Sequence, residues 1–224
     1  GADLNNSADA AQGALEEDPT ASMGDVFNPA LAALHRCPVP TIARINGVAA
    51  GGGLGLALAC DITIAVKSTF LVATFGPRLG IVPDLGSTWS LPRRAGRARA
   101  LGMAMLGDRV SAEQAAQWGL IWKCVEDDQL DSEVAATAEI LKRTNPDAMV
   151  RIRQSIDGAT TTDFVDQLRI EMEHQAVLIP RNMTEGAQAF LEKREPEFDG
   201  RAFCPRCGQL GAAVQSVTNG DAGS

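Results

Sequence analysis

The spacing of apolar and polar residues predicts that strands and helices alternate in the first half of the chain. Residues 41–48 are apolar and rich in β-branched side chains, which predicts a strand, and residues 61–66 and 69–74 predict two more. Between the first two, an apolar run over residues 54–59 predicts a helix. This alternation indicates βαβ units and a largely parallel sheet.

Helical patterns also flank these strands. Asn28 and Pro29 look like the N-cap and first position of a helix that ends near residue 36. Ser111 and Gln114 match a capping box in front of another helix, and residues 121–125 predict a last strand. The remaining predicted helices cover residues 96–106, 131–143, 146–158, 162–178 and 184–193.

Composition narrows the class of protein. The 224 residues are 45% hydrophobic, and no apolar run is long enough to span a bilayer, so we expect a soluble chain with no membrane partner. A formal net charge of −8 argues against a nucleic-acid partner. The odd number of cysteines, five, and the lack of a signal-peptide pattern predict a cytoplasmic protein. Cys204 and Cys207 form one isolated C-x-x-C pair, which is too few ligands to predict a metal site.

A glycine cluster separates the first predicted strand from the helix that follows it. Gly51, Gly52, Gly53 and Gly55 predict a tight turn that leads into a helix N-terminus with free N–H groups. Such a corner can hold a phosphate or stabilise an oxyanion. The phosphate-binding patterns are absent: no Lys-Ser/Thr follows, and Leu56 stands where a third glycine would belong. An oxyanion site and a plain packing turn both stay open.

A carboxylate with apolar neighbours lies farther along. Asp84 follows Pro83, precedes Leu85, and stands close to Trp89 in the sequence. Apolar surroundings disfavour the charged form and should raise the pKa of this carboxyl group toward the range useful for proton transfer. Asp84 is also a good N-cap for a helix that begins near Leu85, and the two interpretations are compatible.

These motifs together resemble the crotonase (enoyl-CoA hydratase/isomerase) superfamily. The resemblance lies in residues 46–61, 80–84, 91–93, 106–120 and 185–194. It implies an α/β crotonase (ClpP-like) fold of stacked ββα units with a C-terminal helical trimerisation region. It further implies a partial core over residues 1–125 without its N-terminal strands, a helical region over residues 126–200 and a flexible tail over residues 201–224.

The resemblance also implies acyl-CoA chemistry at the glycine corner. In this family two backbone N–H groups bind the thioester oxygen, and the N–H of Gly52 takes the position of one of them. The other belongs to a loop whose end matches Ala2, Asp3 and Leu4, so we expect the printed sequence to begin inside that loop. The other residues that we expect on the substrate are Ala50, Gly51, Pro83, Trp89, Phe190 and Lys193. Trp89 stands close enough to Asp84 to shape the acyl pocket, and a core or interface tryptophan is the alternative. For Phe190 and Lys193, the alternatives to substrate binding are a core phenylalanine and a solvated lysine.

The subtype depends on which acid is present. Hydratases of this family carry two glutamates, and their positions align with Gly55 and Gly76, whereas isomerase-like members carry one carboxylate at the position of Asp84. The resemblance is greatest to the branch that rearranges 1,2-epoxyphenylacetyl-CoA. Dehalogenases of the family need a helper histidine, and neither His35 nor His174 falls where that histidine should be.

We therefore expect an acyl-CoA isomerase with Asp84 as its acid/base. The resemblance implies no cofactor other than the CoA of the substrate, and a homotrimer or dimer of trimers. An enoyl-CoA hydratase or 3,2-enoyl-CoA isomerase of β-oxidation is the first alternative. A non-catalytic subunit or fragment is the second.

Overall fold

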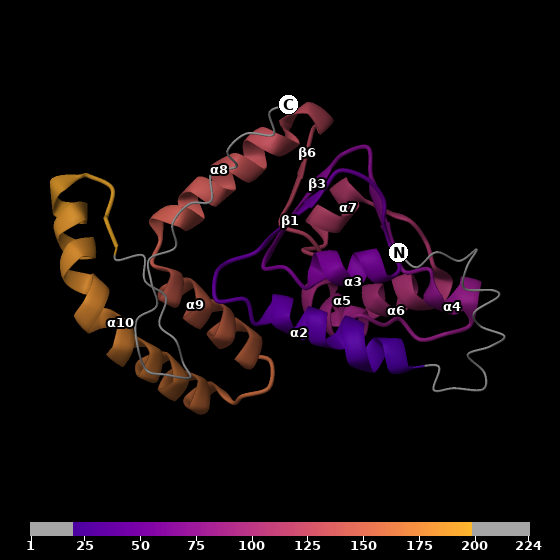
Figure 1. The fold of residues 1–224 in the computed structure, drawn as a ribbon, viewed down its shortest axis with the longest axis horizontal. Coiled ribbons are helices and arrows are strands. Elements are labelled where there is room, and N and C mark those ends of the chain that lie inside the picture. The colour runs from indigo at the N-terminus through magenta and orange to yellow at the C-terminus, as the bar shows by residue number, and fades with distance from the viewer. Residues whose placement is uncertain (1–19, 199–224) are drawn as a thin grey trace, which may run out of the picture. The chain divides into compact units, whose positions relative to one another are not determined.

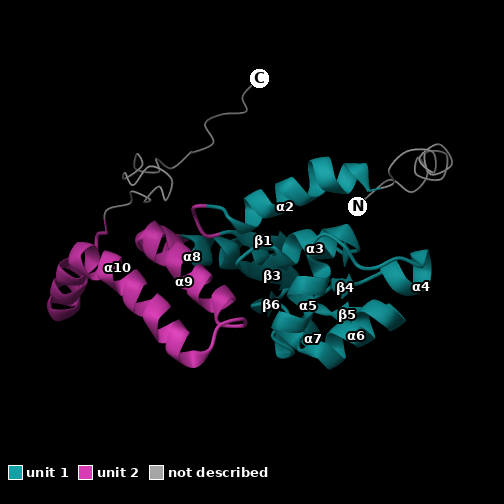
Figure 2. Cartoon of the chain, turned by 90° about the horizontal axis from the view of Figure 1, so that it is seen from below, with its two compact units in different colours: residues 1–37, 41–138 teal, residues 38–40, 139–224 magenta. Residues whose placement is uncertain are grey.

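The structure is a computed structural model that describes residues 20–198. The chain divides into two compact units, one of residues 1–37 and 41–138 and the other of residues 38–40 and 139–224 (Figure 2). The described strands all belong to the first unit, together with the glycine corner and Asp84.

The first unit contains two three-stranded sheets, and Figure 1 labels the strands of one of them. The first sheet has the order β1-β3-β6 and is parallel throughout, with β1 at Ile42–Ile45, β3 at Ile62–Val66 and β6 at Lys123–Val125. The second has the order β2-β4-β5, with β2 at Ala49–Ala50, β4 at Phe70–Val72 and β5 at Val110–Ser111. Its β2–β4 pair is parallel and its β4–β5 pair is antiparallel.

The single strand predicted over residues 41–48 is wrong, because the chain bends at Asn46 and Gly47 and changes sheets. Before the bend, Ile45 pairs with Ala65 in the first sheet. After it, Ala49 pairs with Leu71 in the second. An apolar run cannot reveal this change of partner, since both halves are equally suited to a buried strand.

Helices surround these sheets in the first unit. Their bounds are Met23–Phe27 (η1, a π turn), Asn28–His35 (α2), Gly52–Leu58 (α3), Phe75–Leu79 (α4), Ser87–Ala95 (α5), Arg97–Leu106 (α6), Ala112–Gln117 (α7) and Asp127–Gln129 (η2, a 3₁₀ turn). The Ser111 cap is confirmed, since its hydroxyl accepts a hydrogen bond of 3.2 Å from the Gln114 amide. The Asn28 cap is wrong, because α2 continues η1 and the Asn28 amide donates to the Met23 carbonyl.

β3 is buried on both faces and separates two apolar clusters. Ala65 joins a large cluster with Leu54, Leu58 and Leu71, while Ile64 packs in a smaller one with the first residue of α8. Successive residues of a strand point to opposite faces, so β3 contributes to both clusters. The helix α3 therefore rests directly on the core of the first unit.

The second unit contains the end of α8 (Leu130–Arg143), α9 (Pro146–Gly158) and α10 (Phe164–Glu192). The two helices predicted over residues 162–178 and 184–193 are wrong, because α10 is one helix of 29 residues that runs through Pro180. A proline inside a helix removes one backbone hydrogen bond, and tertiary contacts can offset the free energy that this costs. Arg181, the next residue, binds the buried Asp147 of α9 at 3.0 Å.

Candidate active site

The glycine corner is a tight turn centred on Gly51. Gly51 follows β2 with φ +53°, a conformation that favours glycine. Its amide donates to the Val72 carbonyl at 3.1 Å, and a Cβ at this position would lie 3.3 Å from Thr74 Oγ1. The next residue, Gly52, begins α3.

The first amide of α3 is free to bind an oxygen atom. The Leu54 and Gly55 amides both donate to the Gly51 carbonyl, at 3.0 and 3.3 Å. No hydrogen bond among residues 20–198 uses the Gly52 amide. Because the first N–H groups of a helix have no partner inside it and carry a partial positive charge, this end of α3 favours a developing negative charge.

The segment that carries Asp84 lies against this helix. A Cβ on Gly52 would stand 2.6 Å from Leu85 Cδ1, and a Cβ on Gly55 would stand 2.3 Å from the Leu85 carbonyl oxygen. Leu85 therefore contacts the first turn of α3 through both its side chain and its backbone. Tertiary packing thus brings Leu85, the residue after Asp84, against the helix that begins at Gly52, although Leu85 and Gly52 lie far apart in the sequence.

Asp84 itself is half-buried and poorly solvated. Its Oδ1 atom is buried and has no hydrogen-bond partner among the described residues. Burial raises the pKa of the Asp84 carboxyl group above its ordinary value of 3.8. A buried acceptor without a partner costs free energy, and catalytic groups are one class of residue for which such a cost is retained.

The alternative interpretation of Asp84 as an N-cap is wrong. The N-cap of α5 is Gly86, at φ +75°, and no side chain caps this helix. Leu85 also adopts a positive φ, +49°, and the Asp84 carbonyl accepts the Ser87 amide at 2.9 Å. The backbone alone closes this turn, so the Asp84 carboxylate takes no part in ending or starting a helix.

Gly55 and Gly76, the positions at which the resemblance predicts glutamates in hydratases, have no room for a side chain. At Gly55 a Cβ would meet the Leu85 carbonyl oxygen at 2.3 Å and Ser87 Oγ at 3.0 Å. At Gly76, in α4, it would meet the Ala104 carbonyl oxygen of α6 at 2.7 Å. Glycine at both positions is therefore required by close packing of one backbone on another.

Trp89 lies one turn into α5 and is 39% exposed. The Arg93 guanidinium lies over its ring, 4.2 Å from the ring centroid, and donates to the Trp89 carbonyl at 3.2 Å. The His35 ring from α2 meets the Trp89 ring edge-on, with centroids 5.4 Å apart. Sequence reasoning missed this contact, because no spacing pattern links a residue at the end of α2 to one in α5.

The remaining predicted substrate residues of the first unit lie beside these groups in the chain. Ala50 pairs with Val72 in the second sheet, and Pro83 is half-buried next to Asp84. A cavity of about 390 Å³ opens beside Gly53, between β1, the bend that follows it and the exposed face of α3. The sequence alone gave no sign of this cavity.

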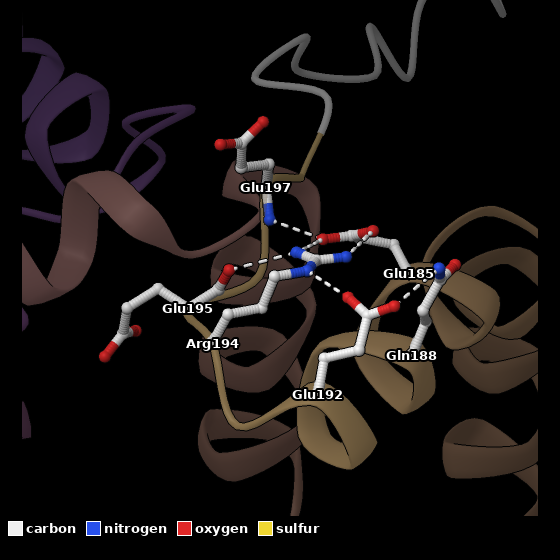
Figure 3. A network of polar contacts seen from close by, with 6 residues as sticks. All are labelled: Glu185, Gln188, Glu192, Arg194, Glu195 and Glu197. Atoms are coloured by element: carbon white, nitrogen blue, oxygen red, sulfur yellow. Dashed lines mark hydrogen bonds and ion pairs between the residues drawn. The ribbon is translucent and has the colours of Figure 1, made fainter.

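Phe190 and Lys193 belong to the second unit, whereas Asp84 belongs to the first. Phe190 is 83% exposed, so the alternative of a core phenylalanine is wrong within the described chain. Lys193 is exposed and ends α10 with φ +55°. The turn after it is held by Arg194, which binds Glu185 and Glu192 at 2.7 Å each (Figure 3).

Some predictions fall on residues outside the described range, namely those for Ala2, Asp3, Leu4, Cys204, Cys207 and residues 201–224. Within residues 20–198, no group of three or more metal-ligating side chains could hold a metal ion. No helix in that range is long and apolar enough to cross a membrane.

A helix N-terminus whose first amide has no acceptor in the described part of the chain, next to a segment that carries a half-buried carboxylate, is an arrangement that can stabilise an oxyanion and move a proton. The family model described as "Enoyl-CoA hydratase/isomerase" matches residues 1–201. The chain therefore belongs to the enoyl-CoA hydratase/isomerase family, and the crotonase resemblance is confirmed.

Individual relatives agree with this assignment. The chain is 42% identical over 192 residues to the 1,2-epoxyphenylacetyl-CoA isomerase of Escherichia coli, covering 82% of this chain and 73% of that protein. It is 41% identical over 176 residues to a probable enoyl-CoA hydratase of Rhodobacter capsulatus, covering 78% and 68%. The likeness to the phenylacetate branch is thus confirmed, while relatives of similar identity carry both isomerase and hydratase names.

Solved structures confirm the predicted fold class. An enoyl-CoA hydratase from Polaromonas sp. JS666 matches with a TM-score of 0.78 and 32% identity, covering 85% of this chain and 75% of that one. An enoyl-CoA hydratase subunit from Geobacillus kaustophilus matches with a TM-score of 0.78 and 30% identity, covering 90% and 76%.

Proposed function

We propose that this protein is an acyl-CoA isomerase that moves a proton along the acyl chain with Asp84 as its single acid/base. The observation that carries the proposal is the buried, unpartnered Oδ1 of Asp84 on a segment packed against the helix that begins at Gly52. The enoyl-CoA hydratase/isomerase family supplies the substrate class, a CoA thioester.

The Gly52 amide is the proposed oxyanion donor. When a proton leaves the carbon next to the thioester, negative charge moves onto the thioester oxygen, and an N–H at a helix N-terminus stabilises that charge. The Gly52 amide has no competing acceptor among the described residues, so no bond has to break before it binds the thioester oxygen. The resemblance assigns a second donor to the loop that ends at Leu4, outside the described residues.

The proton transfer is balanced without any other group. The Asp84 carboxylate takes the α-proton of a 3-enoyl thioester, and the electron pair of the C–H bond enters a dienolate. Protonated Asp84 then returns the proton to the γ-carbon, which places the double bond next to the thioester and restores the carboxylate. A raised pKa suits both steps, because the group must accept and release one proton at the working pH.

The glycines at the two hydratase positions favour this mechanism over hydration. Adding water to a double bond requires a base for the water and an acid for the carbon. Gly55 and Gly76 carry no carboxylate, and a Cβ at either would meet a backbone oxygen at 2.3 or 2.7 Å. Asp84 alone suffices for a 1,3-proton shift.

The experiment follows conjugated thioester absorbance with a 3-enoyl-CoA and, in parallel, with crotonyl-CoA. We expect the wild-type protein to form conjugated product from the 3-enoyl-CoA and Asp84→Asn to lose at least about 100-fold in kcat. Asp128→Asn, a change at an exposed aspartate, is the matched control and should leave kcat unchanged. Loss of crotonyl-CoA absorbance that does not depend on Asp84 would instead identify a hydratase, and inactivity with every CoA thioester would support a non-catalytic subunit.

The proposed acyl group is an aromatic one of the 1,2-epoxyphenylacetyl type. The support is the 42% identity to the Escherichia coli isomerase of that name. Turnover of 1,2-epoxyphenylacetyl-CoA, measured by mass spectrometry of the product, tests this assignment. A kcat/KM for straight-chain 3-enoyl-CoA that exceeds the aromatic value by tenfold or more would reject it.

We further propose that the protein assembles as a homotrimer or a dimer of trimers. Large apolar side chains on α10 are exposed within the described chain, among them Phe164, Leu168, Met172, Ile179 and Met183. Apolar stripes of this kind mark protein–protein contacts. Light scattering after size-exclusion chromatography tests the proposal, and a monomeric mass would reject it.

A further inference from the structure

The helix that offers the Gly52 amide has little stability of its own. It contains seven residues, three of which are glycine. Helices this short are marginal in water, and glycine is among the poorest helix formers. The position of the Gly52 amide must therefore be set by contacts between α3 and its neighbours.

The C-terminal end of α3 is held by Arg94. One nitrogen of this guanidinium, Nη2, donates to the Leu58 carbonyl at 2.9 Å and to the Cys60 carbonyl at 2.7 Å. Nη1 reaches the Leu120 carbonyl at 3.5 Å. The last carbonyls of a helix have no partner inside it and carry a partial negative charge, so a half-buried guanidinium is a strong ligand for this end.

Arg94 also belongs to the helix that follows Asp84. It lies near the end of α5, whose first residue is hydrogen-bonded to the Asp84 carbonyl. The helix α3 thus meets α5 and the segment that leads into it at two places. At one end Gly52 and Gly55 contact Leu85, and at the other end Arg94 binds the carbonyls of Leu58 and Cys60.

Contacts at both ends of α3 restrict the position and the tilt of the helix more than a contact at one end does. The glycine contact fixes the first turn of α3 against Leu85, the buried Leu54 and Leu58 anchor one face of the helix on the core, and Arg94 fixes its last turn. Catalytic groups must be held within a fraction of an ångström, since a displacement of about 1 Å can cost roughly 100-fold in rate.

We propose that Arg94 is a positioning residue that fixes the Gly52 amide relative to the Asp84 carboxylate. The inference rests on the proposed isomerase function. Arg94 binds backbone carbonyls at the end of α3 that lies opposite Gly52, so its proposed effect on the Gly52 amide acts through that helix.

The test compares Arg94→Lys and Arg94→Gln with Arg99→Gln in the complete protein. Arg99 is the matched control, because it is an exposed arginine of the neighbouring helix α6 that also donates to a carbonyl, that of Trp118 at 3.4 Å. Two quantities are measured well below the melting temperature: hydrogen exchange of the Leu54 and Gly55 amides, and kcat and KM with a 3-enoyl-CoA.

We expect Arg94→Gln to speed exchange of the α3 amides at least about tenfold and to lower kcat by roughly 10- to 100-fold with KM changed less than about threefold. Arg94→Lys should fall between it and wild type, since an ammonium keeps the charge but lacks the fork of donors. Millimolar methylguanidinium should restore part of the kcat of Arg94→Gly. Arg99→Gln should change neither quantity.

Three results would overturn the proposal: unchanged exchange in the Arg94 variants, a kcat equal to that of Arg99→Gln, or faster exchange with kcat intact. If Arg94→Gln and Arg94→Gly fail to fold, Arg94→Lys, which keeps the charge, still decides the matter through its exchange rates and its kcat. If the wild-type protein turns over no CoA thioester, the proposed function fails instead, and exchange alone decides whether Arg94 fixes α3.

Discussion

Gly55→Ala is the substitution for which the structure makes the sharpest statement. Alanine is normally the better helix former, and Gly55 lies in the middle of α3. A Cβ at this position would stand 2.3 Å from the Leu85 carbonyl oxygen and 3.0 Å from Leu85 Cβ, where ordinary contacts begin at 3.4 Å. The Leu85 backbone would have to move, and with it the neighbouring Asp84.

The expected magnitude follows from two opposing terms. Overpacking a well-packed site lowers the free energy of unfolding by about 1–3 kcal/mol, and the change from glycine to alanine in a helix raises it by about 1 kcal/mol. Leu85 already adopts φ +49°, so its backbone has little freedom to yield, and the cost should fall in the upper half of that range. We expect a net loss of about 1–2 kcal/mol, or a melting temperature lower by roughly 2–8 °C.

Gly53→Ala is the matched control, because it makes the same change in the same helix. A Cβ on Gly53 meets nothing within 4 Å. Alanine there should stabilise the protein by about 0.4–1 kcal/mol. Thermal melts followed by circular dichroism and urea titrations measure both variants. The reasoning is refuted if Gly55→Ala melts at or above the wild-type temperature, or if the two variants shift in the same direction.

Three further predictions concern charged groups. Burial raises the pKa of Asp84, so its carboxylate destabilises the fold at neutral pH, and Asp84→Asn should keep or raise the melting temperature. The wild-type kcat/KM should rise with pH to a plateau, and the midpoint of that rise should lie above pH 3.8. Asp147 is 6% exposed and bound to Arg151 and Arg181, so changing it to alanine should cost about 3 kcal/mol in urea unfolding, since each of these half-buried guanidinium groups loses a carboxylate contact. Hydrogen bonds from Arg194 lower the pKa of Glu185 from its ordinary value of 4.5 to about 2. The stability that the Glu185 carboxylate adds is therefore complete above pH 4.5 and is lost as the pH falls toward 2. Hydrogen exchange at the end of α10 should show this pH dependence in the wild type and not in Glu185→Gln.

The sequence predicted the candidate site better than it predicted the elements around it. The tight turn at Gly51 and the helix after it followed from the glycine cluster, because only glycine tolerates such a backbone. The raised pKa of Asp84 followed from its apolar neighbours. By contrast, the unity of α10 could not be predicted across Pro180, because proline usually ends or kinks a helix, and the ion pair that ties the next residue to α9 joins residues 34 positions apart.

What the sequence by itself determined are the features that depend on a residue and its immediate neighbours: the glycine turn, the Ser111 cap, the parallel strands and the family. The tertiary structure decided which distant groups meet. It placed Leu85 against Gly55, Arg94 at the end of α3 and His35 against Trp89. The physical reason is that each of these contacts depends on the close packing of two backbones or on the reach of one side chain, and neither leaves a periodic trace in the sequence.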